Sequence, residues 1–202
     1  MRRGQTRPLR KRFLIVCEGT KTEPNYFEGY KSVLPQDIAL VIEGTGTNTL
    51  ALVQATIDYR DEINKRAQTD LNTREIDEAW VVFDKDDFPD SDFNNAINKS
   101  KSNDIKCAYS NEAFELWYIL HFEYLNTGMN RSAYSKKLSS HLPSPYKKNS
   151  ENMFSLLDSK QEDAIRNAKK LAATYGRSPT PAKRNPNTLV YKLITKLNIY
   201  RY

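Results

Sequence analysis

Cysteine and long hydrophobic runs are both scarce in this sequence. The 202 residues include two cysteines, and no apolar run approaches the roughly 18–20 residues that span a membrane. Two cysteines cannot form a disulfide framework, and because both lie in apolar strand-like runs we expect buried free thiols. The first apolar run is short, is interrupted by Glu18 and has no small-residue cleavage site, which argues against a secretory signal. We therefore expect a cytoplasmic protein with no membrane partner.

Glycine is also scarce, with seven residues in the whole chain. None falls in a loop of the Walker type that cradles nucleotide phosphates, which argues against a phosphotransferase. Hydrophobic residues make up 39% of the chain and charged residues 28%, as is typical of a soluble globular protein. At this length the chain suffices for one domain with a proper core and is short for two.

Acidic residues are absent from the beginning of the chain and rare at its end. Residues 1–12 hold six lysines and arginines and no acid, and residues 131–202 hold 15 against four acids. Residues 13–130 reverse this balance, with 21 acids against 10 bases. Such asymmetry is typical of carboxylates that hold a cation beside basic segments that hold a polyanion, although two solvated surfaces of opposite sign would give the same counts. The N-terminal candidates for nucleic-acid contact are Arg2, Arg3, Arg10, Lys11 and Arg12.

The order of the apolar segments predicts an α/β fold. Short β-branched runs that end in turn signals alternate with segments in which apolar residues recur at helical spacing. This alternation predicts a mostly parallel four-stranded sheet with helices on both faces, in which ligands bind at the carboxyl ends of the strands. Thr22 and Asn111 are the expected N-caps of the first and last of these helices. We expect strands at residues 12–19, 38–44, 78–87 and 105–110, and helices at residues 20–34, 45–68, 92–103 and 111–125.

The composition changes after residue 126. Helical stretches are joined there by loops rich in serine and proline, and residues 189–200 close the chain as a helix. We therefore expect a basic, disordered arm (residues 1–12), an α/β core (residues 13–126) and a helical C-terminal extension packed on the core (residues 127–202).

Carboxylates end two of the predicted strands. Glu18 closes the first strand, and Asp84, Asp86 and Asp87 close the third. Asp84 and Asp86 would point the same way in an extended chain, because side chains alternate with a period of two. If the two strands are adjacent, these like charges lie close together at one edge of the sheet. Protons or a divalent cation must then neutralise them. Oxygen ligands without a nearby Cys or His set favour Mg²⁺ or Mn²⁺ over Zn²⁺, whereas "DKDD" by itself also fits a solvated loop with a helix cap.

Longer strings carry a resemblance to known proteins. A strand ending in Glu-Gly, followed two β-α units later by a strand ending in Asp-x-Asp, resembles a Toprim domain, the fold of topoisomerases, primases and OLD-type nucleases. The strings "RFLIVCEGTKTEPNYFE", "VVFDKDDF", "SNEAFELWYILHF" and "RNPNTLVYKLI" resemble the RloB family in order and nearly from end to end. The resemblance implies a Toprim-like, Mg²⁺-dependent endonuclease. It also implies a partner ATPase, association with restriction loci and defence against phage.

The same resemblance implies roles for the acidic residues. Glu18 would bind a first metal or act as general base in nucleotidyl transfer, and Asp84 and Asp86 would be metal ligands. Asp87 would bind a second metal or cap a helix. Glu23 resembles the second glutamate of OLD-type nucleases, and its alternative role is to interact with the dipole of the helix that begins there.

Other candidates lie near these acids or in the last loop. Lys21 would contact the scissile phosphate or pair with a neighbouring acid. Glu115 stands in an otherwise apolar helix, so its burial would need a partner, and it is a candidate for the site. His121 is expected to be a hydrogen-bonded core histidine. An Asn-Pro-Asn-Thr turn before the last helix suits a phosphate, so we also expect nucleic-acid contacts from Lys183, Arg184 and Asn185.

Two functions are compatible with these residues. The first is a metal-dependent nuclease, in which cleavage depends on Glu18 and Asp84. The second is a non-catalytic nucleic-acid-binding or regulatory subunit of an ATPase complex. It would show salt-sensitive binding without cleavage.

Overall fold

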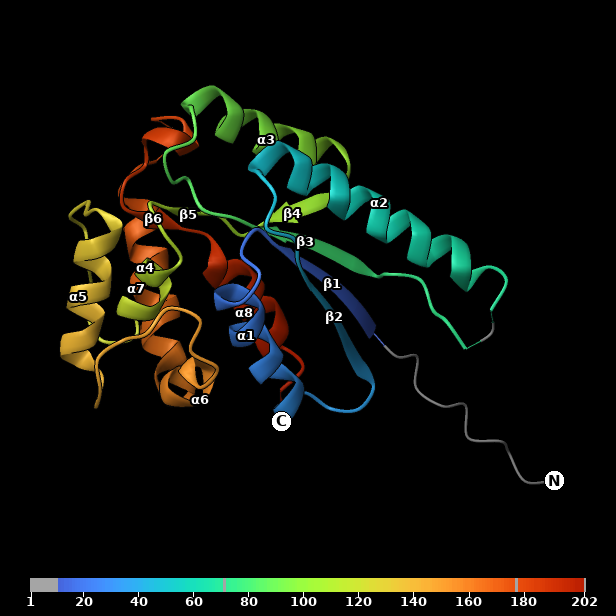
Figure 1. Ribbon diagram of the computed structural model, residues 1–202, viewed down its shortest axis with the longest axis horizontal. Helices are drawn as coiled ribbons and strands as arrows, with labels where there is room; N and C mark the ends of the chain where they lie inside the picture. Colours follow the sequence, from blue (N-terminus) through green and yellow to red (C-terminus); the bar gives the residue numbers. More distant parts are fainter. Residues whose placement is uncertain (1–10, 71, 177, 202) are drawn as a thin grey trace.

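A four-stranded parallel sheet forms the centre of the molecule (Figure 1). The computed structural model describes residues 11–70, 72–176 and 178–201. All three strand pairings are parallel, so the α/β prediction is confirmed. In spatial order the strands are β2 (Ile38–Gly44), β1 (Lys11–Cys17), β3 (Glu78–Val82) and β4 (Ile105–Cys107).

Helices cover both faces of this sheet (Figure 1). One face carries α2 (Thr49–Ala67) and α3 (Asp90–Ser102). The other carries α1 (Thr22–Glu28), which continues into the 3₁₀ turn η1 (Gly29–Ser32), and α8 (Val190–Asn198). No helix within the described ranges combines the length and the apolar character needed to cross a membrane.

Strand β1 is buried because its side chains alternate between two hydrophobic cores. Leu14 and Val16 belong to the core beneath α2 and α3, whereas Phe13, Ile15 and Cys17 belong to a larger core beneath α1 and α8. None of these five residues has exposed surface. A strand covered on both faces reads as a continuous apolar run, which is why this segment is visible in the sequence.

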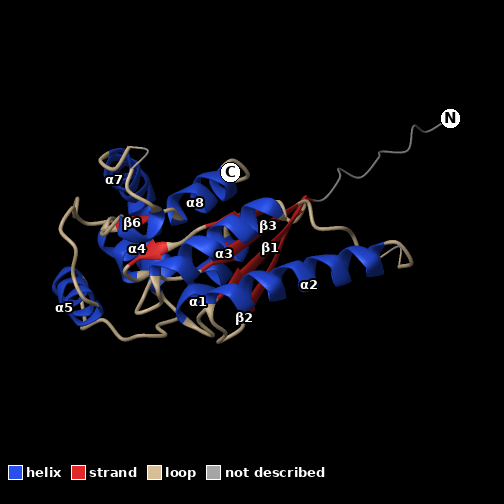
Figure 2. Ribbon diagram, turned by 90° about the horizontal axis from the view of Figure 1, so that it is seen from above, coloured by secondary structure: helices blue, strands red, loops and turns tan. Residues whose placement is uncertain are grey.

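Short elements gather at the end of the sheet toward which the parallel strands point (Figures 1 and 2). A two-stranded antiparallel ribbon of β5 (Ser110–Asn111) and β6 (Asn187–Thr188) joins this end to the last helix. The helices here are α4 (Glu115–Ile119), α5 (Arg131–His141), α6 (Met153–Leu157) and α7 (Gln161–Ala173), with 3₁₀ turns η2 (Asp158–Lys160) and η3 (Pro181–Lys183).

The first strand begins earlier than the sequence predicts. Lys11 and Arg12 belong to β1, and the Lys11 N–H donates to the Asp37 carbonyl at 2.8 Å. The Arg12 N–H donates to Asp77 Oδ2 at 2.7 Å. The predicted disordered arm of residues 1–12 is therefore wrong for its last two residues, because backbone pairing fixes them. Residues 1–10 lie outside the described part of the chain.

The predicted N-caps are also wrong. Thr22 is the first residue of α1, and Lys21 occupies the N-cap position. Asn111 pairs with Asn187 in the ribbon, and its side chain donates to the Ala182 carbonyl at 2.9 Å. Of the predicted helix at residues 111–125, only Glu115–Ile119 is an α-helix, because the ribbon holds Asn111 and the Phe114 N–H donates to Asp84 Oδ2.

Candidate functional site

Acidic side chains line a pocket of about 410 Å³ at the carboxyl end of the sheet. Strands β1 and β3 are neighbours, and Cys17 lies opposite Val82 in their register. Glu18 and Asp84, which follow these two strands, therefore leave the sheet at the same edge. The acids that line the pocket are Glu18, Glu23, Asp84, Asp86 and Glu115.

Backbone hydrogen bonds hold the two strand ends together. The Glu18 N–H donates to the Val82 carbonyl at 2.9 Å, and the Asp84 N–H donates to Glu18 Oε2 at 3.1 Å. Asp84 Oδ2 in turn accepts a hydrogen bond of 3.1 Å from the Phe114 N–H, just before α4. The last two bonds each use one carboxylate oxygen and leave the other for a ligand.

Two buried glutamates extend this arrangement. Glu23, in the first turn of α1, is 6% exposed, and Glu115, at the start of α4, is 8% exposed. The Tyr146 hydroxyl donates to Glu115 Oε1 at 3.0 Å. Glu23 lies directly over Gly19, where a β-carbon would come within 2.2 Å of Glu23 Oε2. The glycine of the "CEG" string is therefore needed for Glu23 to approach the strand end.

We call Glu18, Glu23, Asp84 and Glu115 the carboxylate wall. Burial raises the pKa of Glu18 to about 7, and the charge of Glu23 adds to this, while the Asp84 N–H and Arg131 act in the opposite direction. Burial also raises the pKa of Asp84 well above its ordinary value, and Glu23 and Glu115 raise it further. The pKa of Glu23 is raised by burial and by Glu115. At neutral pH this wall takes up protons or a cation.

Basic side chains from the C-terminal part of the chain line the same pocket as the carboxylates. We call Arg131 and Lys148, which line the same pocket, the basic wall. Arg131 forms an ion pair with Asp86 and lies 3.7 Å from Asp87. Lys148 also lines an adjoining hollow of about 280 Å³, and its charge partly offsets the rise in the pKa of Glu23. The pocket is thus lined both by acids from the strand ends and helices α1 and α4 and by cations from α5 and its following loop.

The three acids of the string "DKDD" take different positions in the structure. Asp84 forms a parallel bridge with Ser110 and still continues the sheet. Asp86 has φ of +48°, so the chain has turned and the expectation that Asp84 and Asp86 point the same way from an extended strand is wrong. Asp86 nevertheless lines the pocket at its rim. The Asp87 side chain is 97% exposed and does not line the pocket.

The remaining candidates near the acids take different positions. Lys21 is exposed and lines the adjoining hollow together with Lys148. His121 is 2% exposed, and its Nδ1 lies 2.9 Å from the Trp117 carbonyl oxygen. Burial lowers the pKa of His121 to about 4, so it is a neutral core residue away from the pocket.

The predicted nucleic-acid contacts do not gather at this pocket. Lys11 and Arg12 lie at the amino end of β1, the opposite end of the strand from Glu18. Arg2, Arg3 and Arg10 lie outside the described residues.

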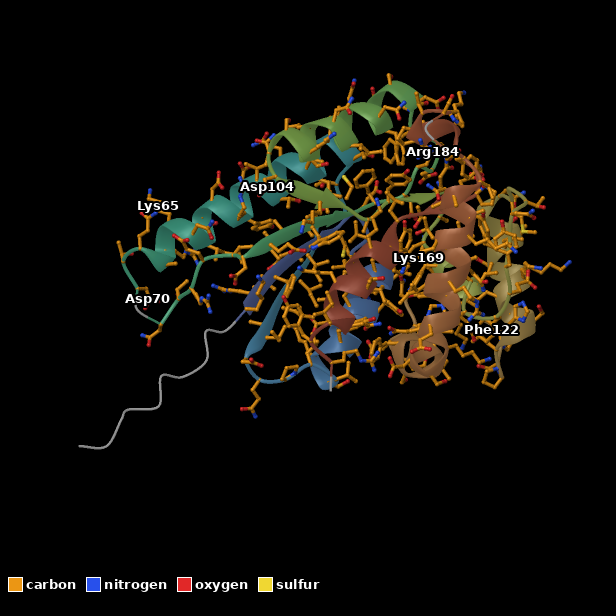
Figure 3. All side chains as sticks on the ribbon, turned by 180° about the vertical axis from the view of Figure 1, so that it is seen from behind. Lys65, Asp70, Asp104, Phe122, Lys169 and Arg184 are labelled. Atoms are coloured by element: carbon orange, nitrogen blue, oxygen red, sulfur yellow. The ribbon has the colours of Figure 1, made fainter. Side chains whose placement is uncertain are left out.

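The C-terminal loop also holds its basic residues away from the carboxylates. Lys183 pairs with Asp90 at 2.6 Å, and Arg184 Nε donates to the Pro179 carbonyl at 2.8 Å, beside the start of α3 (Figure 3). Asn185 packs against Gly128. None of the three lines the carboxylate pocket or the adjoining hollow.

Sequence analysis missed three residues of the site. Arg131, Tyr146 and Lys148 come from a segment rich in serine and proline, where no periodic pattern shows which side chains face the core. The available signals were the change in charge that begins at Arg131 and the "YKK" string after a loop proline.

The donor chemistry of the pocket suits a hard divalent cation. Within the described ranges, no group of three or more His, Cys, Asp or Glu side chains is placed so that it could hold a metal ion. Mg²⁺, however, usually keeps several waters and takes only one or two carboxylates. Glu18 and Asp84, joined through the Asp84 N–H, are the residues that would hold it.

Comparison with known proteins identifies the family. A family model described as "RloB-like protein" matches residues 13–197, a range that contains both walls of the pocket. Comparison with curated proteins gave no significant match, and neither did comparison with solved structures. The parallel sheet shows the α/β class, while the likeness to a Toprim domain stays a prediction. Because the match covers nearly the whole chain, this protein belongs to the RloB family.

Proposed function

We propose that this protein is a divalent-metal-dependent nuclease that hydrolyses phosphodiester bonds in nucleic acid. One observation carries the proposal: a single pocket is lined by both the carboxylate wall and the basic wall. Buried like-charged acids destabilise a fold unless they bind something, and perturbed carboxylates in a pocket are typical of functional sites. The basic side chains of the same pocket give it a place for a phosphate.

The carboxylate wall would divide its tasks among its members. A divalent cation, when bound, lowers the pKa of an attacking water and stabilises the charge that develops on the phosphate. Glu18 and Asp84 would hold this cation. Glu23, whose pKa is raised by burial and by Glu115, accepts a proton from the attacking water. Tyr146 fixes the orientation of Glu115 through its hydroxyl.

The basic wall would bind the substrate. Arg131 offers a planar guanidinium that can donate two parallel hydrogen bonds to a phosphate, and its present partner, Asp86, sits at the rim. Lys148 provides a point charge beside Glu23. Together the two cations hold the phosphodiester against the acids and exclude other orientations.

The test is cleavage of labelled DNA and RNA, single- and double-stranded, in Mg²⁺ or Mn²⁺. The wild-type protein should cleave, and Glu18→Gln should not. Glu43→Gln is a matched control, because Glu43 is a carboxylate near the end of β2 at the same edge of the sheet, outside both pockets. Binding without cleavage by the wild-type protein in every metal would instead identify a regulatory subunit.

The proposal extends to a partner ATPase and to defence against phage, which rest on membership of the RloB family. If the ATPase controls the nuclease, the isolated chain should cleave slowly and the complex faster. Glu18→Gln should abolish cleavage both by the isolated chain and by the complex, while the ATPase still co-purifies with the chain. A complex whose cleavage survives Glu18→Gln would place the active site elsewhere.

A further inference from the structure

A further pocket, of about 370 Å³, is lined by Tyr146 and other residues of the segment that joins α5 to α6. Its walls are largely apolar, and we call it the α5–α6 hollow. Leu156, one of its wall residues, is 38% exposed although it is a large apolar side chain. The other apolar walls come from Leu142, Pro145, Met153 and the ring of Tyr146.

Tyr146 forms the partition between this hollow and the carboxylate pocket. Its ring lines the hollow, while its hydroxyl donates to Glu115 on the carboxylate wall. The next two residues continue the partition, because Lys147 lines the hollow and Lys148 lines the carboxylate pocket. Consecutive residues of one segment therefore line the hollow and the carboxylate pocket.

The chemistry of the hollow suits a nucleobase. Apolar side chains and an aromatic ring offer a surface against which a flat base stacks. Ser150 and Asn152 add polar groups of the kind that bind base edges, and Lys147 adds a positive charge. The lining includes no acidic residue, so it does not repel a polyanion. Its volume falls within the range of small-molecule sites.

We infer that the α5–α6 hollow binds an unpaired base of the nucleic-acid strand whose phosphate lies between the carboxylate wall and the basic wall. The identity of the strand as substrate rests on the proposed function. A base inside a duplex is stacked and paired, so it must leave the helix before it can enter such a pocket. The protein should therefore prefer single strands, loops or overhangs to blunt duplexes.

Binding in EDTA tests the inference without requiring cleavage. Fluorescence anisotropy would measure the affinity for short labelled DNA and RNA strands and for blunt duplexes of the same sequence. We expect single strands of at least one of the two nucleic acids to bind about tenfold more tightly than the duplex. A fluorescent purine analogue placed at successive positions should change its emission at one position, where the base stacks on Tyr146.

Two variants address the hollow directly. Lys147→Glu reverses its charge, and Ser144→Trp fills its mouth from an exposed position. Each should weaken single-strand binding about tenfold and abolish the position-specific emission change. Lys169→Glu is the control, because it makes the same charge change on the exposed side of α7 (Figure 3). Lys169 lines neither the carboxylate pocket nor the α5–α6 hollow, so this variant should alter binding less than twofold.

The outcomes separate this inference from the proposed function. Equal affinity for strand and duplex, or unchanged binding in both hollow variants, would overturn the inference even if the protein cleaves nucleic acid. Strand-specific binding that both variants lose would support it even if no cleavage is found. A wild-type protein that binds no nucleic acid would overturn both.

Discussion

The carboxylate wall and the pair Asp86–Asp87 lie at the same end of the sheet but behave differently. Glu23 and Glu115 are buried, and burial, with a smaller contribution from the neighbouring acids, raises the pKa of Glu18, Asp84 and Glu23. Asp86 instead pairs with Arg131, and Asp87 extends into solvent.

The difference shows what burial does to like charges. An exposed or paired acid costs the fold little, because water or a cation already stabilises its charge. Buried acids without a counter-ion destabilise the fold, so a protein keeps them where they bind or react. The wall therefore marks the site more clearly than the number of acids in "DKDD" does.

The largest effect on cleavage is expected from Asp84→Asn. Cleavage should fall by at least about 10²-fold, because the cation loses a ligand and the wall loses a charge. The asparagine oxygen can still accept the Phe114 N–H, so the fold persists. With one buried charge removed, the metal-free variant should melt about 2–4 °C higher, equivalent to roughly 1 kcal/mol in a chain of this size. A cleavage assay and a thermal melt would measure both effects, and a variant that loses activity by unfolding would contradict the prediction.

Substitution in the basic wall should lower the cleavage rate less than Asp84→Asn does. Lys148→Ala removes one charged contact to the substrate phosphate, so kcat/KM should fall about 10- to 100-fold. Lys136→Ala is the matched control, since Lys136 is an exposed lysine of α5 that lines neither pocket. Steady-state cleavage rates compare the two. Equal rates for both variants would remove Lys148 from the site.

The sheet and much of the carboxylate wall were predictable from the sequence. An uninterrupted apolar strand that ends in Glu-Gly identifies Glu18, and parallel pairing with the third strand brings Asp84 beside it. Glu115 was detectable because it interrupts an apolar run. These signals are local, or follow from a simple rule of parallel sheets.

The basic wall was not predictable in the same way. Arg131 and Lys148 reach the pocket only through the packing of α5 and its following loop against the core, and sequence periodicity carries no information about such long-range contacts. The extended backbone expected at Asp86 was mispredicted for a related reason, because the positive φ of that residue ends the strand geometry, although Asp84 and Asp86 both line the pocket.

The raised pKa of Glu18 should make the melting temperature depend on pH by a few degrees, which ordinary surface acids would not do. The pKa of Glu18 in the fold is about 7, above its ordinary value of 4.5, so the folded state binds the proton more tightly than the unfolded state. The stabilisation is therefore complete below about pH 4.5 and is lost as the pH rises through 7. The melting temperature of the metal-free protein should fall over this window, and Glu18→Gln should flatten the fall.

The same melting experiment can be repeated with Mg²⁺ present. Because Mg²⁺ binds ionised carboxylates, it should raise the melting temperature more at pH 7.5 than at pH 5. Glu43→Gln should behave like the wild-type protein with and without Mg²⁺. If the wild-type protein and Glu18→Gln have parallel pH profiles, Glu18 does not carry the raised pKa.

The smallest effect is expected from Asp87→Asn. Asp87 follows the same strand as Asp84 and resembles a metal ligand in the sequence, but its side chain is 97% exposed and its contact with Arg131 is 3.7 Å long. Solvent screens so exposed a pair, so cleavage should stay within about twofold and the melting temperature within about 1 °C of the wild-type values. Activity and melting are measured beside Asp84→Asn under identical conditions. A loss of cleavage comparable to that of Asp84→Asn would mean that Asp87 turns inward when substrate binds, and the division of "DKDD" into a buried ligand and a solvated rim would then be wrong.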